Sequence, residues 1–239
     1  MFGIPGGGSS LDLIEAAGAL GLDFILVRSE TAGALMAAVS GELTGVPGVM
    51  LAGVGPGAAS AANGVAYASL ERAPMVLLTD GPAQSLHQAF DHRALLRPVA
   101  KHQARLTPDH ADAVMETLLD ITQALPRGPV HIDLTATDAA TPITTNGPAA
   151  IDASAADPLP AQVRDGDIDA ARALLAASRK PLIIAGMEAR YDGAAPALDA
   201  FARQLGAPVL LTYKAKGCLA DDDARLLEHL QVLGDRGLG

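Results

Sequence analysis

The stretch GVMLAGVGPG, residues 48–57, decides the fold class of this chain. It begins with an apolar run of the length of one buried strand, and Gly55-Pro56-Gly57 then ends the strand and begins a helix. Glycines let a ligand approach the backbone, and the first N–H groups of a helix are open to a ligand. The same pattern is also typical of a tight turn that packs a helix on a sheet, and both interpretations stay open.

The alternation of short apolar runs with helical patterns extends on both sides of this stretch. The pattern predicts further strands over residues 1–4, 24–27, 75–79 and 130–134. It predicts one helix over residues 31–43 and another that runs through residues 63–67. Two more helices are expected: one begins after Ser9, which forms a helix-start box with Asp12, and one has Thr107 as its cap and Pro108 at its first position. Short apolar strands separated by helices indicate an α/β fold. We expect a doubly wound, mostly parallel sheet with helices on both faces.

A change of composition divides the chain. The sequence predicts a first domain over residues 1–140, a linker over 141–165 rich in Ala, Thr, Asp and Pro, and a partial second α/β domain over 166–239. In the second part, helical patterns around 168–175 and 198–205 alternate with apolar runs at 181–186 and 208–212. Two such units are few for an independent domain, because small units bury a small fraction of their surface.

Composition excludes several classes of function. Apolar residues make up 49% of the chain but aromatic residues only 3%, so the core must be built from aliphatic side chains with tight packing through Gly and Ala. A net charge of −10 argues against nucleic acid and anionic membrane surfaces as partners. A single cysteine, no apolar run of about 18 residues and no secretory signal indicate a cytoplasmic protein without an internal disulfide.

Glu30 is the leading candidate for a chemical role. It follows the apolar run at 24–27, and a carboxylate at the end of a buried strand costs free energy unless it is paired or used. Together with Gly55-Pro56-Gly57, it would line a ligand crevice at the carboxyl ends of two strands. The alternative is an acid in the first turn of a helix, where the helix dipole favours negative charge.

The other polar or flexible segments have simpler interpretations. Gly6-Gly7-Gly8 reads as a flexible turn, and the polar group around Gln88 reads as a solvated loop. Asp91, His92 and His102 match no standard metal-ligand spacing, so we predict no metal site in this chain. Asp133 reads as a structural acid. Cys218 follows two lysines that would lower the pKa of a thiol, but a thiol without function is the better interpretation.

Several segments together resemble the thiamine-diphosphate-dependent enzymes of the acetolactate synthase and benzoylformate decarboxylase type. The segments that carry the resemblance across residues 1–135 are FGIPGG (2–7), VRSE (27–30), GPGA (55–58), NG (63–64), APMV (73–76), RPVAK (97–101) and RGPVHID (127–133). They stand in family order with family spacing. Residues 180–220 look like the start of that family's central domain.

This resemblance implies that the first domain binds the pyrimidine ring of thiamine diphosphate. Glu30 would be the acid that hydrogen-bonds N1′ of that ring and so activates the cofactor toward a 2-keto acid. Gly55, Pro56, Gly57 and Asn63 would line the cofactor pocket. Gly6, Gly7 and Gln88 would lie on the substrate side.

The chain departs from the family pattern in ways that affect the substrate. Ser29 stands where the family often has His, His87 stands for an aromatic residue, and Val39-Ser40 stands for Gly-Tyr. The Gly-Asp-Gly motif through which the family holds diphosphate and Mg²⁺ is absent, and Asp165-Gly166-Asp167 lies in the wrong domain. The resemblance therefore implies a truncated product or one half of a split enzyme, inactive alone, that acts in a homo- or hetero-oligomer with a diphosphate-binding domain.

Two rival functions stay open. One is a non-catalytic assembly or regulatory homologue that has kept the fold, and the departures at Ser29, His87 and Val39 support it. The other is a plain nucleotide-binding α/β domain.

Overall fold

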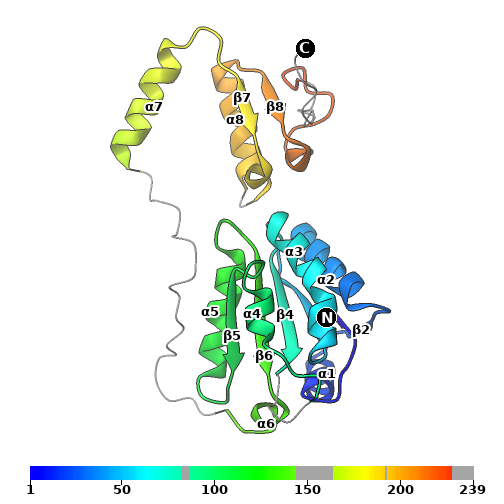
Figure 1. Ribbon diagram of the computed structural model, residues 1–239. Helices are drawn as coiled ribbons and strands as arrows, with labels where there is room; N and C mark the ends of the chain where they lie inside the picture. The colour runs from blue at the N-terminus through cyan, green and yellow to red at the C-terminus, as the bar shows by residue number, and fades with distance from the viewer. Residues whose placement is uncertain (82–86, 144–163, 192, 228–239) are drawn as a thin grey trace, which may run out of the picture. The chain divides into compact units, whose positions relative to one another are not determined.

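The computed structural model describes residues 1–81, 87–143, 164–191 and 193–227 (Figure 1). The chain divides into two compact units, Met1–Ala161 and Gln162–Gly239. The finer boundaries of a domain over 1–140 and a linker over 141–165 stay a prediction, and residues 144–163 of that linker lie outside the described part.

The first unit is built on a six-stranded sheet whose strands are all parallel to their neighbours, in the order β2-β1-β3-β4-β6-β5. The strands are β1 (Phe2–Gly3), β2 (Ile25–Leu26), β3 (Gly48–Ala52), β4 (Met75–Asp80), β5 (His102–Leu106) and β6 (Pro129–Leu134). The helices are α1 (Ser10–Ala19), α2 (Glu30–Thr44), α3 (Pro56–Leu70), α4 (His92–Leu96), α5 (Ala111–Gln123) and α6 (Ala136–Ala139). The predicted α/β class and parallel sheet are confirmed.

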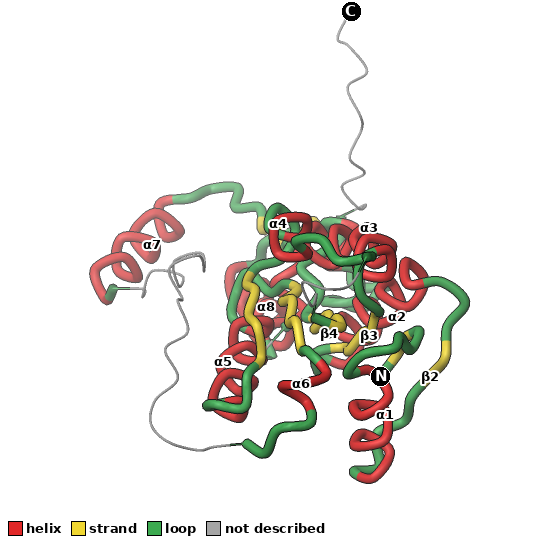
Figure 2. Tube along the Cα trace, turned by 60° about the horizontal axis from the view of Figure 1, so that its bottom comes forward, coloured by secondary structure: helices red, strands yellow, loops and turns green. Residues whose placement is uncertain are grey.

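Helices cover both faces of this sheet. Figure 2, seen from near the ends of the strands, shows α3 and α4 on one side of the sheet and α1 and α5 on the other. The apolar side chains follow the same division, because successive residues of a strand point to opposite faces. Met75 and Leu77 of β4 pack in the core under α2 and α3, whereas Val76 packs with Leu118 of α5.

Small residues bring α2 and α3 into close contact, as the composition predicts. A Cβ atom on Gly64 of α3 would lie 2.3 Å from the Cβ of Ala34 in α2. One on Gly48, at the start of β3, would lie 1.9 Å from the carbonyl oxygen of Ala37. Ala34, Ala37, Ala61 and other alanines fill the layer between these helices and the sheet. The core is therefore closed by approach of backbones rather than by large side chains.

Three local expectations are wrong. The strand before Glu30 is not buried: β2 is an edge strand, and Ile25 and Leu26 are 47% and 69% exposed. Ser9 does not cap α1, because its hydroxyl donates to Asp80 Oδ1 and to the carbonyl oxygen of Leu134.

The third error concerns the start of α5. The helix begins at Ala111 rather than at Pro108, because His110 takes a left-handed conformation with φ 62°. The preceding strand, β5, was not expected from the sequence, since its polar residues His102, Gln103 and Arg105 hide the apolar pattern.

The second unit is smaller. It holds the helices α7 (Asp165–Ala177) and α8 (Ala194–Leu205), the parallel strands β7 (Ile183–Ala185) and β8 (Val209–Leu211), and the 3₁₀ turns η2 (Met187–Arg190) and η3 (Tyr213–Ala215). Its core joins Ala202 of α8 to Val209 and Leu211 of β8. Cys218 is buried there, and burial raises the pKa of its thiol in spite of nearby Arg190. The pKa-lowering effect of the lysines is thus not found.

Within the described residues, we find no helix with the length and apolarity needed to span a membrane.

Two helical glycines give a matched test of the packing between α2 and α3. Gly64→Ala should lower the free energy of unfolding by about 1–3 kcal/mol, because the new methyl group has no room against Ala34. Gly18→Ala in α1 meets nothing within 4 Å and should raise it by up to about 1 kcal/mol. Urea unfolding followed by circular dichroism measures both. Equal effects of the two substitutions would contradict the close approach of the helices.

Candidate functional site

The candidate site lies where the order of the strands reverses. From β1 the chain passes to β2 on one side and later returns to β3 on the other, so the carboxyl ends of β1 and β3 border a switch point. Open α/β sheets bind ligands in the crevice at such a point. Gly6 follows β1 here, Glu30 follows β2 and Gly55 follows β3. A Cβ atom on Gly53 would lie 3.6 Å from Gly6 Cα, which shows how close the two loops are.

Glu30 is the first residue of α2 and is half-buried. The hydroxyl of Ser29 accepts a hydrogen bond from the backbone N–H of Ala32 at 3.1 Å and so caps the helix in front of it. One carboxylate oxygen of Glu30 lies 3.6 Å from the point where a Cβ on Gly57 would stand. Within the described part of the chain, that carboxylate has no hydrogen bond or ion pair. Its lone pairs are therefore available to a ligand.

Gly55 occupies a conformation that no other residue fits. Its φ of 61° and ψ of −109° lie outside the regions open to L-residues with a side chain. A Cβ there would also lie 2.0 Å from the carbonyl oxygen of Gln88. The Gly55 N–H donates to Nε2 of buried His92 at 2.8 Å, and Pro56 then begins α3. The turn is thus fixed on two sides.

Asp80 holds the loop after β1. Its buried carboxylate accepts hydrogen bonds from Ser9 Oγ at 2.9 Å, Ser10 N at 3.0 Å and Ser10 Oγ at 3.2 Å. The Gly6 N–H donates to Ser10 Oγ at 2.8 Å, and a Cβ on Gly6 would lie 2.3 Å from Asp80 Oδ2. Gly7 has open space around its Cα. The glycine loop is therefore an anchored loop rather than a freely flexible turn.

The structure brings some predicted residues together and leaves others apart. The carboxylate of Glu30 lies beside Gly57, and the main chain of Gln88 lies against Gly55. The side chain of Gln88 is exposed. Asn63 is exposed on α3, six residues and more than one turn beyond Gly57, and no hydrogen bond among the described residues joins it to Glu30.

A buried polar cluster beneath Gly55 was missed by the sequence analysis. Asp91 is exposed, so Asp91, His92 and His102 do not form a site together. His92 instead contacts Asp133, and its ring lies 6.3 Å from that of His131 between centroids. Thr79 contacts both Asp133 and His131. The sequence carries one sign of this cluster, because His131 and Asp133 stand two residues apart in an apolar strand and so point to the same face of the sheet. Thr79 lies beside them because it pairs with Asp133 in the register of β4 and β6.

Burial alone would raise the pKa of the Asp133 carboxyl group. Hydrogen bonds from His131, His92 and Thr79 outweigh it and hold that pKa well below the ordinary range. Asp133 is therefore ionised in the folded protein at neutral pH.

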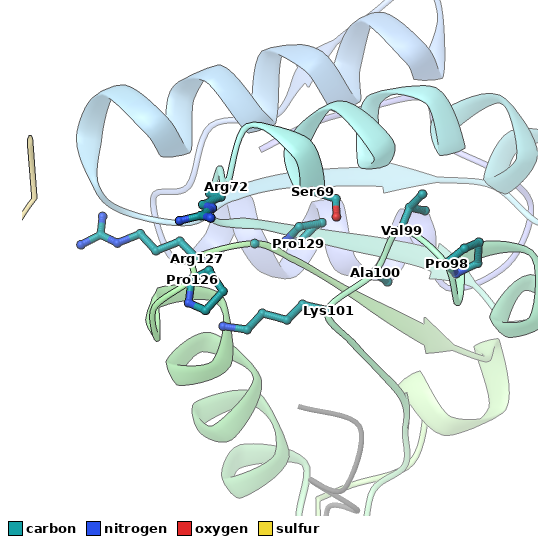
Figure 3. A pocket seen from close by; sticks show the side chains of 10 residues that line it. Ser69, Arg72, Pro98, Val99, Ala100, Lys101, Pro126, Arg127 and Pro129 are labelled. Carbon is teal, nitrogen blue, oxygen red and sulfur yellow. The ribbon is translucent and has the colours of Figure 1, made fainter. Parts of the chain in front are cut away.

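A cavity of about 300 Å³ lies at the amino ends of the strands, beside the start of β6, whereas the candidate site lies at their carboxyl ends (Figure 3). Arg72, Lys101 and Arg127 line it together with Pro126 and Pro129. The ammonium group of Lys101 donates to the carbonyl oxygens of Ile121 and Ala124 at 2.6 and 2.7 Å and so caps the end of α5. Because all strands are parallel, this cavity is a whole strand length away from Glu30 and is not part of the candidate site.

Two models of one protein family match this chain. Residues 1–104 match the N-terminal TPP binding domain of thiamine pyrophosphate enzymes, and residues 168–238 match the central domain of the same enzymes. The first match contains Glu30, both glycine loops and His92. The second falls within the second compact unit.

Curated proteins are similar to this chain over 93–100% of its length. It is 29% identical to acetolactate synthase from Bacillus subtilis over 93% of this chain and 39% of that protein. It is 27% identical to a probable 2-ketoarginine decarboxylase from Pseudomonas aeruginosa over 93% of this chain and 40% of that protein. It is 30% identical to the acetolactate synthase isozyme 3 large subunit from Escherichia coli over 100% of this chain and 42% of that protein. The chain thus spans about two fifths of the length of these relatives.

The depressed pKa of Asp133 predicts how acid affects stability. A carboxyl group that binds protons less readily in the folded state stabilises the fold above the ordinary Asp pKa of about 4, and this contribution is lost as the pH falls below it. The unmodified chain should therefore lose stability more steeply than Asp133→Asn between about pH 5 and pH 2. Thermal unfolding at several pH values measures this, with exposed Asp120→Asn as the control. Parallel curves for the unmodified chain and Asp133→Asn would contradict the assignment.

Proposed function

Because the chain belongs to the thiamine pyrophosphate enzymes and carries their N-terminal and central domains, we propose that it is the thiamine-diphosphate-binding portion of a 2-keto-acid carboligase or decarboxylase. Similarity to proteins named acetolactate synthase and 2-ketoarginine decarboxylase supports this reaction class.

The observation that carries the proposal is the position of the Glu30 carboxylate. It is half-buried at a switch point, faces a glycine, and has no partner in the described part of the chain. A carboxyl group held in this way can share a proton with a ring nitrogen of a ligand. In the proposed function, Glu30 holds that proton against N1′ of the aminopyrimidine ring.

The surrounding residues fit a flat ring. Gly57 offers no side chain beside the Glu30 carboxylate, and the Gly55 turn leaves backbone surface at the start of α3. The anchored loop of Gly6 and Gly7 borders the same crevice and is proposed to meet the substrate. When bound, thiamine diphosphate supplies a thiazolium ring that acts as an electron sink for the 2-keto acid.

We propose that diphosphate and Mg²⁺ are held by a domain of a partner subunit. Met36, Val39 and Leu43 form an exposed apolar stripe on α2, the helix that begins with Glu30, and are 49%, 38% and 72% exposed. Such a stripe is suited to cover by another subunit. A partner packed there would close the crevice beside Glu30 and exclude water from it.

Ligand-dependent stabilisation tests the proposal. The chain mixed with a candidate partner that carries Gly-Asp-Gly should be stabilised by thiamine diphosphate with Mg²⁺ and not by ATP with Mg²⁺, because only a ligand that binds the folded state raises the melting temperature. Stabilisation by ATP instead would support a nucleotide-binding domain. Assembly with the partner but no response to thiamine diphosphate would support the non-catalytic homologue.

The role of Glu30 can be tested in the reconstituted enzyme. Glu30→Gln keeps the shape of the side chain but cannot exchange a proton, so turnover of the 2-keto acid should fall by about 10²-fold or more. Glu15→Gln on the exposed face of α1 serves as the matched control and should leave turnover unchanged. Near-normal turnover of Glu30→Gln would remove this residue from the mechanism.

A further inference from the structure

Three buried polar side chains beneath the Gly55 turn have no place in the proposed function. His92 and His131 are 0% exposed and Asp133 is 5% exposed. Buried polar groups cost free energy unless they are hydrogen-bonded, so the arrangement of their protons is strongly constrained. That arrangement can be read from the partners of each nitrogen.

The hydrogen bonds of His92 select one tautomer. The Gly55 N–H is a donor, so Nε2 of His92, 2.8 Å away, must be the unprotonated nitrogen. Nδ1 lies 2.9 Å from Asp133 Oδ1 and must carry the hydrogen, because a carboxylate only accepts. A doubly protonated ring would point a second N–H at the Gly55 N–H. His92 is therefore neutral, with its proton on Nδ1.

His131 takes the opposite tautomer. The hydroxyl of Thr79 lies 2.5 Å from Asp133 Oδ1 and donates to it, which leaves the hydroxyl oxygen to accept from Nε2 of His131 at 2.8 Å. Nδ1 of His131 has no hydrogen-bond partner among the described residues. Asp133 thus orients Thr79 and His92 through the same carboxylate oxygen.

We propose that His92 is a positioning residue: oriented by Asp133 as the neutral Nδ1–H tautomer, it fixes the Gly55 amide and so holds Gly57 against the Glu30 carboxylate. The inference rests on the proposed function, because it gives a purpose to the position of Gly57. Gln88 blocks the outer side of the turn, where there is no room for a Cβ on Gly55. His92 supplies the inner side and pairs an N–H that would otherwise be buried without an acceptor.

A metal ion would need the atoms that the hydrogen bonds already use. One ligand atom from each of His92, His131 and Asp133 lies within 4.8 Å of the other two. Nδ1 of His92 and Nε2 of His131 lie 2.9 and 3.4 Å from Asp133 Oδ1 and are the nitrogens that would ligate a cation beside it. In the hydrogen-bonded network, both nitrogens carry hydrogens and donate them to Asp133 and Thr79. Binding of a cation would remove both hydrogens and break both contacts. Addition of Zn²⁺ is therefore part of the test.

Two substitutions of His92 separate its two contacts. The amide of glutamine reaches the place of Nε2, so His92→Gln keeps an acceptor for the Gly55 N–H and loses the donor to Asp133. The shorter amide of asparagine reaches the place of Nδ1, so His92→Asn keeps the donor and loses the acceptor. The proposal requires the glutamine variant to retain the fixed turn and the asparagine variant to lose it.

The first measurement uses the ligand-free chain labelled with ¹⁵N. Ring ¹⁵N spectra should show Nδ1–H for His92 and Nε2–H for His131, with no change on addition of Zn²⁺. Exchange of the Gly55 amide with D₂O should be about tenfold or more faster in His92→Asn and little changed in His92→Gln, with Leu77 as the core reference. The opposite tautomers, a response of both rings to Zn²⁺, or equal exchange in the two variants would overturn the proposal.

The second measurement links the turn to the cofactor in the assembly with the partner subunit. His92→Asn should weaken binding of thiamine diphosphate by about tenfold or more, while His92→Gln stays near the unmodified protein. Equal affinities would show that the network only stabilises the fold, and would overturn the positioning role. If the unmodified assembly fails to bind thiamine diphosphate, the proposed function fails, and the tautomers and amide exchange still show separately whether His92 fixes the turn.

Discussion

The turn at Gly55 is the constraint on which the site depends. Its positive φ, the backbone of Gln88 on the outer side and the ring of His92 on the inner side leave one conformation for the start of α3. That conformation places Gly57 beside the Glu30 carboxylate, although these two residues belong to different strand–helix units. The Gly55 turn is therefore held by one hydrogen bond, from its N–H to His92, and by one steric limit, the main chain of Gln88.

Much of the fold was predictable because its signals are local. The apolar runs at β3, β4 and β6 are each as long as a buried strand, and glycines follow the first two runs and precede the third. β5 was missed because its polar residues obscure its period. The burial of β2 was predicted wrongly, because apolar character does not tell an edge strand such as Ile25–Leu26 from a central one.

The candidate site was only partly predictable. Glu30 and the Gly55 turn carry local signals, and their pairing followed from the expected parallel sheet, in which the carboxyl ends of strands border one crevice. The partners of Asp80 and Asp133 were not foreseen, because Ser9 and His92 reach them from 71 and 41 residues away in the sequence. Contacts of this kind depend on strand order and register. A two-residue spacing of polar side chains in β6 was the one local sign of them.

The most direct measurement locates thiamine diphosphate on the chain. In the assembly with the partner subunit, the amide resonances of Glu30 and Gly57 should shift on titration with thiamine diphosphate and Mg²⁺. The amide resonances of Arg72 and Gly128, which line the cavity at the amino ends of the strands, should not shift. Shifts confined to Arg72 and Gly128, with Glu30 and Gly57 unmoved, would contradict the account.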